Sequence, residues 1–215
     1  MDKKSVLKAI KELRELPKRN FKQSFDLTLN LKDLDIKKPE HQINFFAQLH
    51  YPSKKRRVCA LIGPELEPEA RGVCDKVIMQ EEFVNYSKDK RGAKRLASEF
   101  DFFIAQANLM AQIAASFGRF LGPKGKMPNP KAGCVVPLKA ALKPLYDKLQ
   151  LMRPLVIKNS LVLHCQVACE DMKDEEVAEN VMAVCNQLVK HLPREQANIR
   201  RVLLKLTMSK PVIIT

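Results

Sequence analysis

The segment FDLTLNL, residues 25–31, alternates apolar and polar side chains without interruption. In an extended chain its apolar residues all fall on one side, namely Phe25, Leu27, Leu29 and Leu31. Its polar residues all fall on the other side, namely Asp26, Thr28 and Asn30. This pattern predicts a strand of an antiparallel sheet that has one buried face and one open face.

The C-terminal part of the chain has the same character. LVLHCQV, residues 161–167, also alternates, and IRRVLLKLTM, residues 199–208, is predicted as a further strand. Residues 174–191 carry apolar side chains at helical spacing, which predicts an amphipathic helix. The first segment, which ends at Pro17, predicts another helix, and INFFAQL, residues 43–49, predicts a strand. Because the two ends of the chain resemble each other, we expect them to build one half-exposed sheet.

The middle of the chain has a different pattern. VCALIG and FDFFIAQA, residues 58–63 and 100–107, are continuous apolar runs, which are typical of strands buried on both faces. Helical stretches are predicted at about 81–98, 106–118 and 137–149. This alternation of strands and helices predicts a parallel sheet covered by helices.

The sequence therefore predicts a two-domain protein that combines an α+β and an α/β fold. A split α+β terminal domain would comprise residues 1–55 plus 155–215, and a three-layer α/β domain, residues 56–154, would be inserted into it. The two crossings, near 51–57 and near 153–156, carry prolines and basic residues. Two crossings between the same pair of domains predict a hinge.

The charge balance points to a polyanionic partner. The chain of 215 residues has 38 basic and 24 acidic residues, which gives a formal net charge of +14. Such a surface attracts nucleic acids or anionic membranes, the alternative being a basic protein without such a partner. The sequence lacks an apolar run of the roughly 18 residues that a spanning helix needs, and its start lacks the apolar core of a signal peptide. We therefore expect no membrane association.

The six cysteines predict buried, reduced thiols in a cytoplasmic protein, because most lie among aliphatic residues and none forms a CxxC pair. His164 with Cys165, Cys169 and Cys185 could imitate a metal cluster. Structural metal sites usually take their ligands from close pairs, so we expect no metal and no other cofactor here. Among the four histidines, no catalytic arrangement of Ser, His and Asp or of Cys and His stands out.

A basic loop, FLGPKGKMPNPKAG at residues 120–133, contains three lysines and no acidic residue. It does not match the nucleotide P-loop, because Phe120 replaces the first glycine and Met127 replaces the final Ser or Thr. The dinucleotide fingerprint GxGxxG is also absent. The residues leave two interpretations, namely a stiff cationic surface that contacts an RNA backbone and a solvated loop whose prolines end helices.

Four ordered motifs resemble one known family. They are RNFKQSFDLTLNLKDLDIKKPEHQIN (19–44), DFFIAQANLM (101–110), LGPKGKMPNP (121–130) and VLLKLTMSKP (202–211). Together they are similar to the archaeal branch of the ribosomal protein L1 family, the universal protein of the lateral (E-site) stalk of the large subunit. The resemblance spans nearly the whole chain and implies the split terminal domain with a Rossmann-like insert.

The resemblance also implies the function. It implies a structural constituent of the large ribosomal subunit that binds 23S-type rRNA at the stalk and assists the release of E-site tRNA. It implies a cytoplasmic location in the ribosome, a monomer when free of it, and binding to the protein's own mRNA as a translational repressor. The alternative from another class is a nucleotide-dependent enzyme that uses the α/β insert.

By the same resemblance, an rRNA site on the terminal domain would comprise Phe21, Ser24, Asp26, Thr28, Lys158, Thr207, Met208 and Ser209. Three of these polar residues share one face of the first strand, where they could meet RNA 2′-hydroxyls. A carboxylate such as Asp26 can accept a hydrogen bond from a 2′-hydroxyl or a guanine edge. For Phe21 and Met208, the residue types alone favour core packing over RNA contact.

The loop would supply a secondary contact for RNA or tRNA, comprising Gly122, Lys124, Gly125, Lys126, Met127, Asn129 and Lys131. Two residues depart from the family pattern: Ser209 and Ala168 each stand where a glycine is usual. If the glycine that Ser209 replaces has a positive φ, the serine would be strained.

Overall fold

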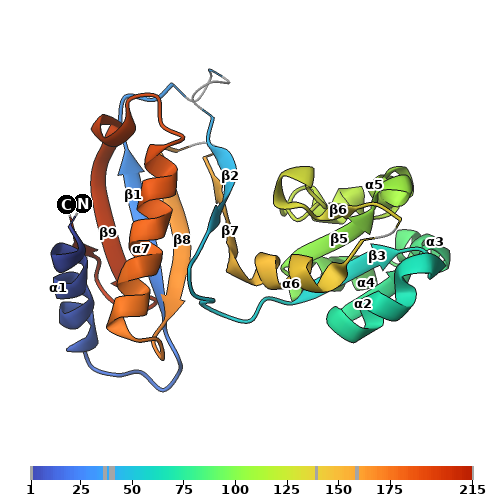
Figure 1. Cartoon of the computed structure of the whole chain (residues 1–215), viewed down its shortest axis with the longest axis horizontal. Helices are drawn as coiled ribbons and strands as arrows, with labels where there is room; N and C mark the ends of the chain where they lie inside the picture. Colours follow the sequence, from blue (N-terminus) through green and yellow to red (C-terminus); the bar gives the residue numbers. More distant parts are fainter. Residues whose placement is uncertain (1, 36–37, 39–41, 139, 158–159, 215) are drawn as a thin grey trace. The chain divides into compact units, whose positions relative to one another are not determined.

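A computed structural model describes residues 2–35, 38, 42–138, 140–157 and 160–214. The chain divides into two compact units (Figure 1). The terminal unit comprises residues 1–54 and 151–215, and the insert unit comprises residues 55–150. This arrangement confirms the predicted two-domain class with an α+β part and an α/β part.

The centre of the terminal unit is an antiparallel sheet with the strand order β10-β9-β1-β8. Its strands are β1 (Ser24–Leu31), β8 (Val162–Cys169), β9 (Ile199–Leu206) and β10 (Val212–Ile213). Two helices, α1 (Lys3–Arg14) and α7 (Asp174–Val189), pack with the buried side of this sheet into one core, and Figure 1 shows α7 crossing its face. Because β1 lies between β8 and β9, segments from both ends of the chain meet across it.

The alternation predicted for residues 25–31 is confirmed. The apolar side chains of β1 are fully or almost fully buried, namely Phe25, Leu27, Leu29 and Leu31. Asp26, Thr28 and Asn30 are partly exposed on the opposite face. In the described part of the chain this second face is left open to solvent, because α1 and α7 both pack into the apolar core on the other side.

A β-bulge interrupts the alternation of β8. Phe25 pairs with Ala168 and the next residue, Asp26, pairs with Gln166, so Val167 is the extra residue of β8. Both Val167 and Ala168 are therefore buried, although they are neighbours in sequence. The bulge explains why the alternation predicted for residues 161–167 does not continue.

The buried Asn180 of α7 bonds the carbonyl at this bulge. Its side-chain nitrogen donates to the Val167 carbonyl at 2.9 Å and to the Tyr51 carbonyl at 3.0 Å. Its side-chain oxygen accepts the backbone N–H groups of His50 and Tyr51 at 3.1 and 3.0 Å. One amide therefore joins α7, β8 and the segment that follows β2.

A second, two-stranded sheet of the terminal unit pairs β2 (Asn44–Gln48) with β7 (Met152–Val156). Phe46 of β2 is opposite Pro154 of β7. A proline cannot donate to a sheet, and a two-stranded sheet has an outer edge on each strand, so Pro154 is tolerated there. The predicted strand at 43–49 is thus present, whereas the crossing expected near 153–156 is a strand.

The insert unit is built on a parallel sheet with the order β4-β3-β5-β6. Its strands are β3 (Val58–Ile62), β4 (Lys76–Met79), β5 (Phe102–Gln106) and β6 (Val135–Val136). Its helices are α2 (Glu67–Val73), α3 (Phe83–Lys88), α4 (Lys90–Glu99), α5 (Met110–Leu121) and α6 (Leu142–Leu151). Every residue of β3 is buried, as the continuous apolar run predicts.

One predicted helix of the insert is wrong in extent. The stretch predicted at 81–98 is divided into α3 and α4 at Asp89. The Asp89 side chain accepts the backbone N–H groups of Arg91 and Gly92 at 3.1 and 3.0 Å, which starts a new helix. Gly92 permits this cap, because a Cβ there would lie only 2.3 Å from an Asp89 carboxylate oxygen.

Candidate nucleic-acid interface

The open face of the sheet carries polar side chains from three strands. Asp26 lies between Gln166 of β8 and Lys205 of β9 in the register of the sheet. Thr28 lies between His164 and Leu203 in the same way. Cross-strand neighbours on one face have their Cβ atoms about 5 Å apart, so these residues form one surface.

Three residues of this surface were not part of the predicted site: His164, Gln166 and Lys205. The Thr28 hydroxyl lies 3.2 Å from Nδ1 of His164, within hydrogen-bonding distance. The alternation of residues 161–167 already places His164 and Gln166 on the polar side of their strand. Assigning them to the surface of Asp26 and Thr28 requires the pairing of β1 with β8, which the sequence does not give.

At one end of the sheet, Ser24 and Thr207 form a hydroxyl cluster. The Ser24 backbone N–H donates to Oγ1 of Thr207 at 3.0 Å, and the two hydroxyl oxygens lie 3.1 Å apart. The Ser24 hydroxyl also donates to the Asp26 carboxylate at 3.3 Å. Both hydroxyls therefore have fixed positions beside Asp26 on the open face.

Ser209 fits its turn without strain. Asp33 and Glu195 are the non-glycine residues with positive φ in the described part of the chain, so Ser209 has an ordinary backbone conformation. Its hydroxyl accepts the Leu206 backbone N–H at 2.8 Å, and the Ser209 backbone N–H donates to the Leu206 carbonyl at 3.1 Å. The serine thus closes the turn that follows β9, and the strain considered from the sequence is absent.

Phe21 and Met208 are exposed, so core packing is the wrong interpretation for them. Phe21 is 50% exposed and Met208 is 62% exposed. The Met208 backbone N–H donates to the side-chain oxygen of the buried Gln23 at 3.2 Å, which holds the turn beside the start of β1. Two large apolar side chains are therefore in solvent: Met208 follows Thr207 directly, and Phe21 lies three residues before Ser24 in the chain.

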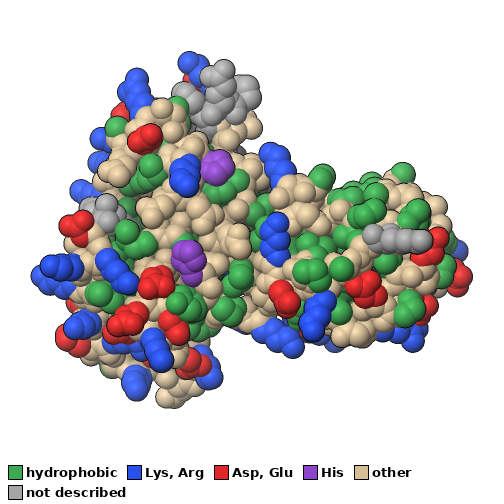
Figure 2. All heavy atoms as spheres, viewed as in Figure 1, with side chains coloured by type: hydrophobic (Ala, Val, Ile, Leu, Met, Phe, Trp, Pro, Cys, Tyr) green, Lys and Arg blue, Asp and Glu red, His purple; other side chains and the backbone are tan. Residues whose placement is uncertain are grey.

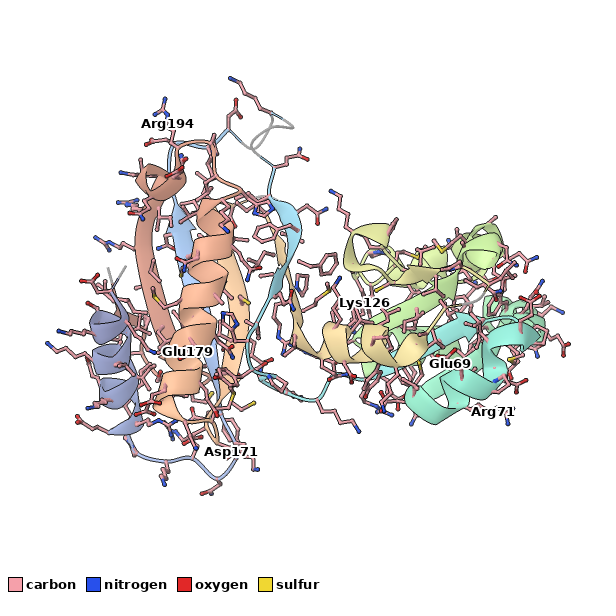
Figure 3. All side chains as sticks on the ribbon, viewed as in Figure 1. Glu69, Arg71, Lys126, Asp171, Glu179 and Arg194 are labelled. Atoms are coloured by element: carbon pink, nitrogen blue, oxygen red, sulfur yellow. The ribbon has the colours of Figure 1, made fainter. Side chains whose placement is uncertain are left out.

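Cations flank this end of the sheet. Lys22 pairs with Asp171 at 2.7 Å, and this hydrogen bond and the carboxylate charge raise the pKa of Lys22. Asp171 lies in the turn before α7 (Figure 3). Lys205 donates to the Thr207 carbonyl at 3.0 Å. The Lys158 of the predicted site lies outside the described residues. The side of the terminal unit that carries α7 instead mixes acidic and basic side chains (Figure 2).

The loop at 120–133 is folded onto its own unit. Lys126, labelled in Figure 3, donates to the Phe100 carbonyl at 2.6 Å, and burial is the main cause that lowers its pKa. Lys124 donates to the Ser98 hydroxyl at the end of α4. Gly125 has a φ of +66°, a conformation that favours glycine. The loop is therefore held by specific contacts, two of which use its lysines.

The remaining predicted loop residues have mixed surroundings. Met127 is partly buried against the insert core, and Asn129 caps the short turn Pro130–Ala132 by accepting the Lys131 N–H at 2.9 Å. The side chain of Lys131 is exposed, and so is Gly122. Of the predicted loop site, Gly122, Lys124, Gly125 and Lys131 are therefore the residues that face solvent.

The position where an α/β fold could bind a nucleotide offers a phosphate little in this chain. In the order β4-β3-β5-β6 the strand order reverses between β3 and β5, which is where such folds bind ligands. There the Gly63 N–H donates to the side-chain oxygen of the buried Gln106 at 2.8 Å, and the Gln106 amide donates to Glu65 at 3.2 Å. Pro64 has no N–H to offer. The Gly63 N–H already has an acceptor and the Glu65 carboxylate carries negative charge, so this position disfavours a bound phosphate.

Four of the six cysteines are buried: Cys59, Cys134, Cys165 and Cys185. Burial raises the pKa of Cys74 and of Cys134 to about 11 each. Across the described residues, acidic, histidine and cysteine side chains form no group suited to hold a metal ion. Across the same residues, none of the helices combines the length and apolar character that crossing a bilayer requires.

Comparison with known proteins gives matches along the whole chain. The model of the Ribosomal protein L1p/L10e family matches residues 10–210. The chain is 37% identical over 218 residues to the large ribosomal subunit protein uL1 of Methanothermococcus thermolithotrophicus, with coverage of 100% of this chain and 99% of that protein. It is 35% identical to uL1 of Thermococcus kodakarensis, with coverages of 98% and 97%. It is 37% identical to uL1 of Methanocaldococcus jannaschii, with coverage of 99% of this chain and 95% of that protein.

Proposed function

The chain belongs to the ribosomal protein L1p/L10e family, and from this premise we propose that it binds 23S-type rRNA at the lateral stalk of the large subunit. It is a structural component of the large subunit in cytoplasmic ribosomes and is not an enzyme. The alternative of a nucleotide-dependent enzyme is therefore wrong, in agreement with the Gly63 N–H, which is already bonded to Gln106.

One observation carries the proposal: the Ser24–Thr207 hydroxyl cluster lies on the open sheet face, and the nearby chain at Phe21 and Met208 exposes two large apolar side chains. The Ser24 and Thr207 hydroxyls are already held in place, so they can donate to or accept from RNA 2′-hydroxyls without losing much side-chain entropy on binding. Phe21 and Met208 can then pack against riboses or bases. The site therefore comprises Phe21, Ser24, Asp26, Thr28, Thr207, Met208 and Ser209, with Lys158 as a further phosphate contact.

Asp26 fits this role despite its charge. A carboxylate repels phosphates, but it accepts hydrogen bonds from 2′-hydroxyls and from the amino edge of guanine, which a lysine cannot do. Lys205 lies opposite Asp26 in the sheet and balances its charge. The pair favours a folded RNA whose sugars and base edges meet the protein at this point over an RNA that offers only phosphates.

The roles of the two domains, the monomeric state and the mRNA binding are inferred from the same family. Residues 1–55 plus 155–215 would be the rRNA-binding domain, and residues 56–154 would be an insert that reaches E-site tRNA with the loop at 122–131 and assists tRNA release. The protein would be a monomer off the ribosome. An mRNA that folds like the stalk would meet the same sheet face, so the protein would repress translation of its own message.

We predict that Thr207→Val weakens binding to a stalk-rRNA fragment about tenfold, whereas Thr207→Ser stays within twofold of the original chain. Valine keeps the volume but removes the hydroxyl that Ser24 also contacts, so about 1 kcal/mol of folding free energy is lost as well. A gel-shift titration, with folding checked by circular dichroism, measures the difference. If the Val and Ser variants bound the stalk-rRNA fragment equally well, the Thr207 hydroxyl would not contact RNA.

A further inference from the structure

We propose that helix α4 of the insert unit, together with Lys124, is a separate binding surface for the phosphate backbone of a second RNA. This inference rests on the proposed function in that it assumes an RNA-binding protein. It concerns the insert unit and not the sheet face, and apart from Lys124 its residues lie outside the predicted loop.

The surface consists of two cationic rows on one helix. Lys90 and Lys94 are four residues apart, and so are Arg91 and Arg95. All four are exposed, while the opposite side of α4 is buried through Ala93, Leu96 and Ala97. Residues four apart on a helix are neighbours about 6 Å apart along its axis. Such rows suit successive phosphates of one strand.

Lys124 extends this surface beyond the helix. Its ammonium donates to the Ser98 hydroxyl, and Ser98 in turn donates to the Lys94 carbonyl at 3.0 Å. Ser98 lies one turn after Lys94, so Lys124 stands at the end of the row begun by Lys90 and Lys94. The loop and the helix therefore present a continuous line of positive charge.

The cationic side chains of α4 have no ion-pair partner in the part of the chain that the structure describes. None of the ion pairs found among the described residues includes a lysine or arginine of α4. Nearby carboxylates have other partners, since Glu99 pairs with Arg57 and Asp101 pairs with Arg56. An exposed, unpaired set of cations remains available to an external polyanion.

The placement of these charges opposes helix stability. A helix favours acidic residues in its first turn and basic residues in its last turn, yet α4 begins with Lys90 and Arg91 and ends with Glu99. Like charges four residues apart are also unfavourable. Helix α7 follows the first part of this rule, with Asp174, Glu175 and Glu176 in its first turn. A local conflict of this kind is typical of a functional surface.

The test compares two triple variants of equal charge in the full chain. The first is Lys90→Gln, Lys94→Gln and Arg95→Gln. The matched control is Lys4→Gln, Lys8→Gln and Lys11→Gln, which are exposed lysines of α1 on the terminal unit. A labelled RNA hairpin without stalk sequence is titrated into each protein, both free and saturated with an unlabelled stalk-rRNA fragment. A polyglutamate of equal charge serves as the second probe.

We expect the α4 variant to bind the hairpin at least tenfold more weakly, and the control to change less than twofold. The slope of the logarithm of hairpin affinity against the logarithm of salt concentration should become shallower by about one for each lost phosphate contact. The melting temperature of the α4 variant should stay unchanged or rise, which a purely structural role would not produce. The proposal would be overturned if the α4 variant bound the hairpin as well as the control variant does. It would also be overturned if the α4 variant lost polyglutamate binding to the same extent as hairpin binding.

The stalk titration separates this proposal from the preceding one. The α4 variant should keep its affinity for the stalk fragment within about threefold, because its changes lie outside the sheet face. If the unmodified chain fails to prefer the stalk fragment, the proposed function fails. The hairpin comparison on the free protein still decides whether α4 binds RNA.

Discussion

Replacing both Phe21 and Met208 by alanine should lower the affinity for a stalk-rRNA fragment by about 100-fold, with little change in stability. Contact of an aromatic side chain such as Phe21 with a base is worth about 1–3 kcal/mol, and Met208 adds apolar packing, so we expect roughly tenfold from each replacement. Both side chains are largely exposed, so their removal leaves no cavity in the core. Filter binding measures the affinity, and urea unfolding should show a change within about 0.5 kcal/mol.

A matched control is Leu16→Ala, which removes another exposed apolar side chain of the terminal unit. Leu16 is 42% exposed and lies just after α1, outside the proposed site. We expect its loss to leave stalk affinity within twofold. If the double replacement has no more effect than Leu16→Ala, Phe21 and Met208 do not contact RNA. If it instead lowers stability by several kcal/mol, their exposure in the folded chain is wrong.

Asn180→Ala should lower the free energy of unfolding of the terminal unit by about 3–5 kcal/mol. The change leaves the His50 and Tyr51 N–H groups and the Tyr51 and Val167 carbonyls without their side-chain partner. Each buried group that loses its hydrogen bond costs about 1–3 kcal/mol. The total is a large fraction of the 5–15 kcal/mol that is typical of a folded domain. Urea unfolding followed by far-ultraviolet circular dichroism measures it.

Asn186→Ala provides the control, because Asn186 lies on the same helix but is exposed. It should change the free energy of unfolding by no more than about 0.5 kcal/mol. Equal effects of the two substitutions would contradict the role of Asn180 as the joint between α7, β8 and the segment after β2. At temperatures where the Asn180 variant is still folded, stalk affinity should be retained, since Asn180 is buried on the helix side.

The fold was predictable wherever local periodicity and burial agree. The period of two in residues 25–31 and the apolar run of β3 each identified a strand, because one or both faces of these strands are buried. The bulge at Val167 and the strand β7 with Pro154 were not predictable, since both depend on pairing with distant segments. Strand β6 comprises only Val135–Val136, which is too short for any period to appear.

The candidate site was only partly predictable, for a related reason. The residue pattern placed Asp26 and Thr28 on an open face, and the family resemblance added Thr207 and Met208. Ser24 and Thr207 are 183 residues apart, so their hydrogen bond depends on the register between β1 and β9. The exposure of Phe21 and Met208 depends on turns outside the sheet, which no alternation describes. The cations of α4 were visible in the sequence, but their lack of partners was not.

Selectivity for the stalk is the central claim, because a chain with a net charge of +14 binds any polyanion to some degree. The most direct measurement is a competition titration at physiological salt. A labelled stalk-rRNA fragment is displaced by the same fragment or by an unrelated RNA of equal length. We predict that the unrelated RNA must be present at about 1,000-fold higher concentration to displace half of the label, as specific binding requires. Displacement at the same concentration by both RNAs would contradict the account.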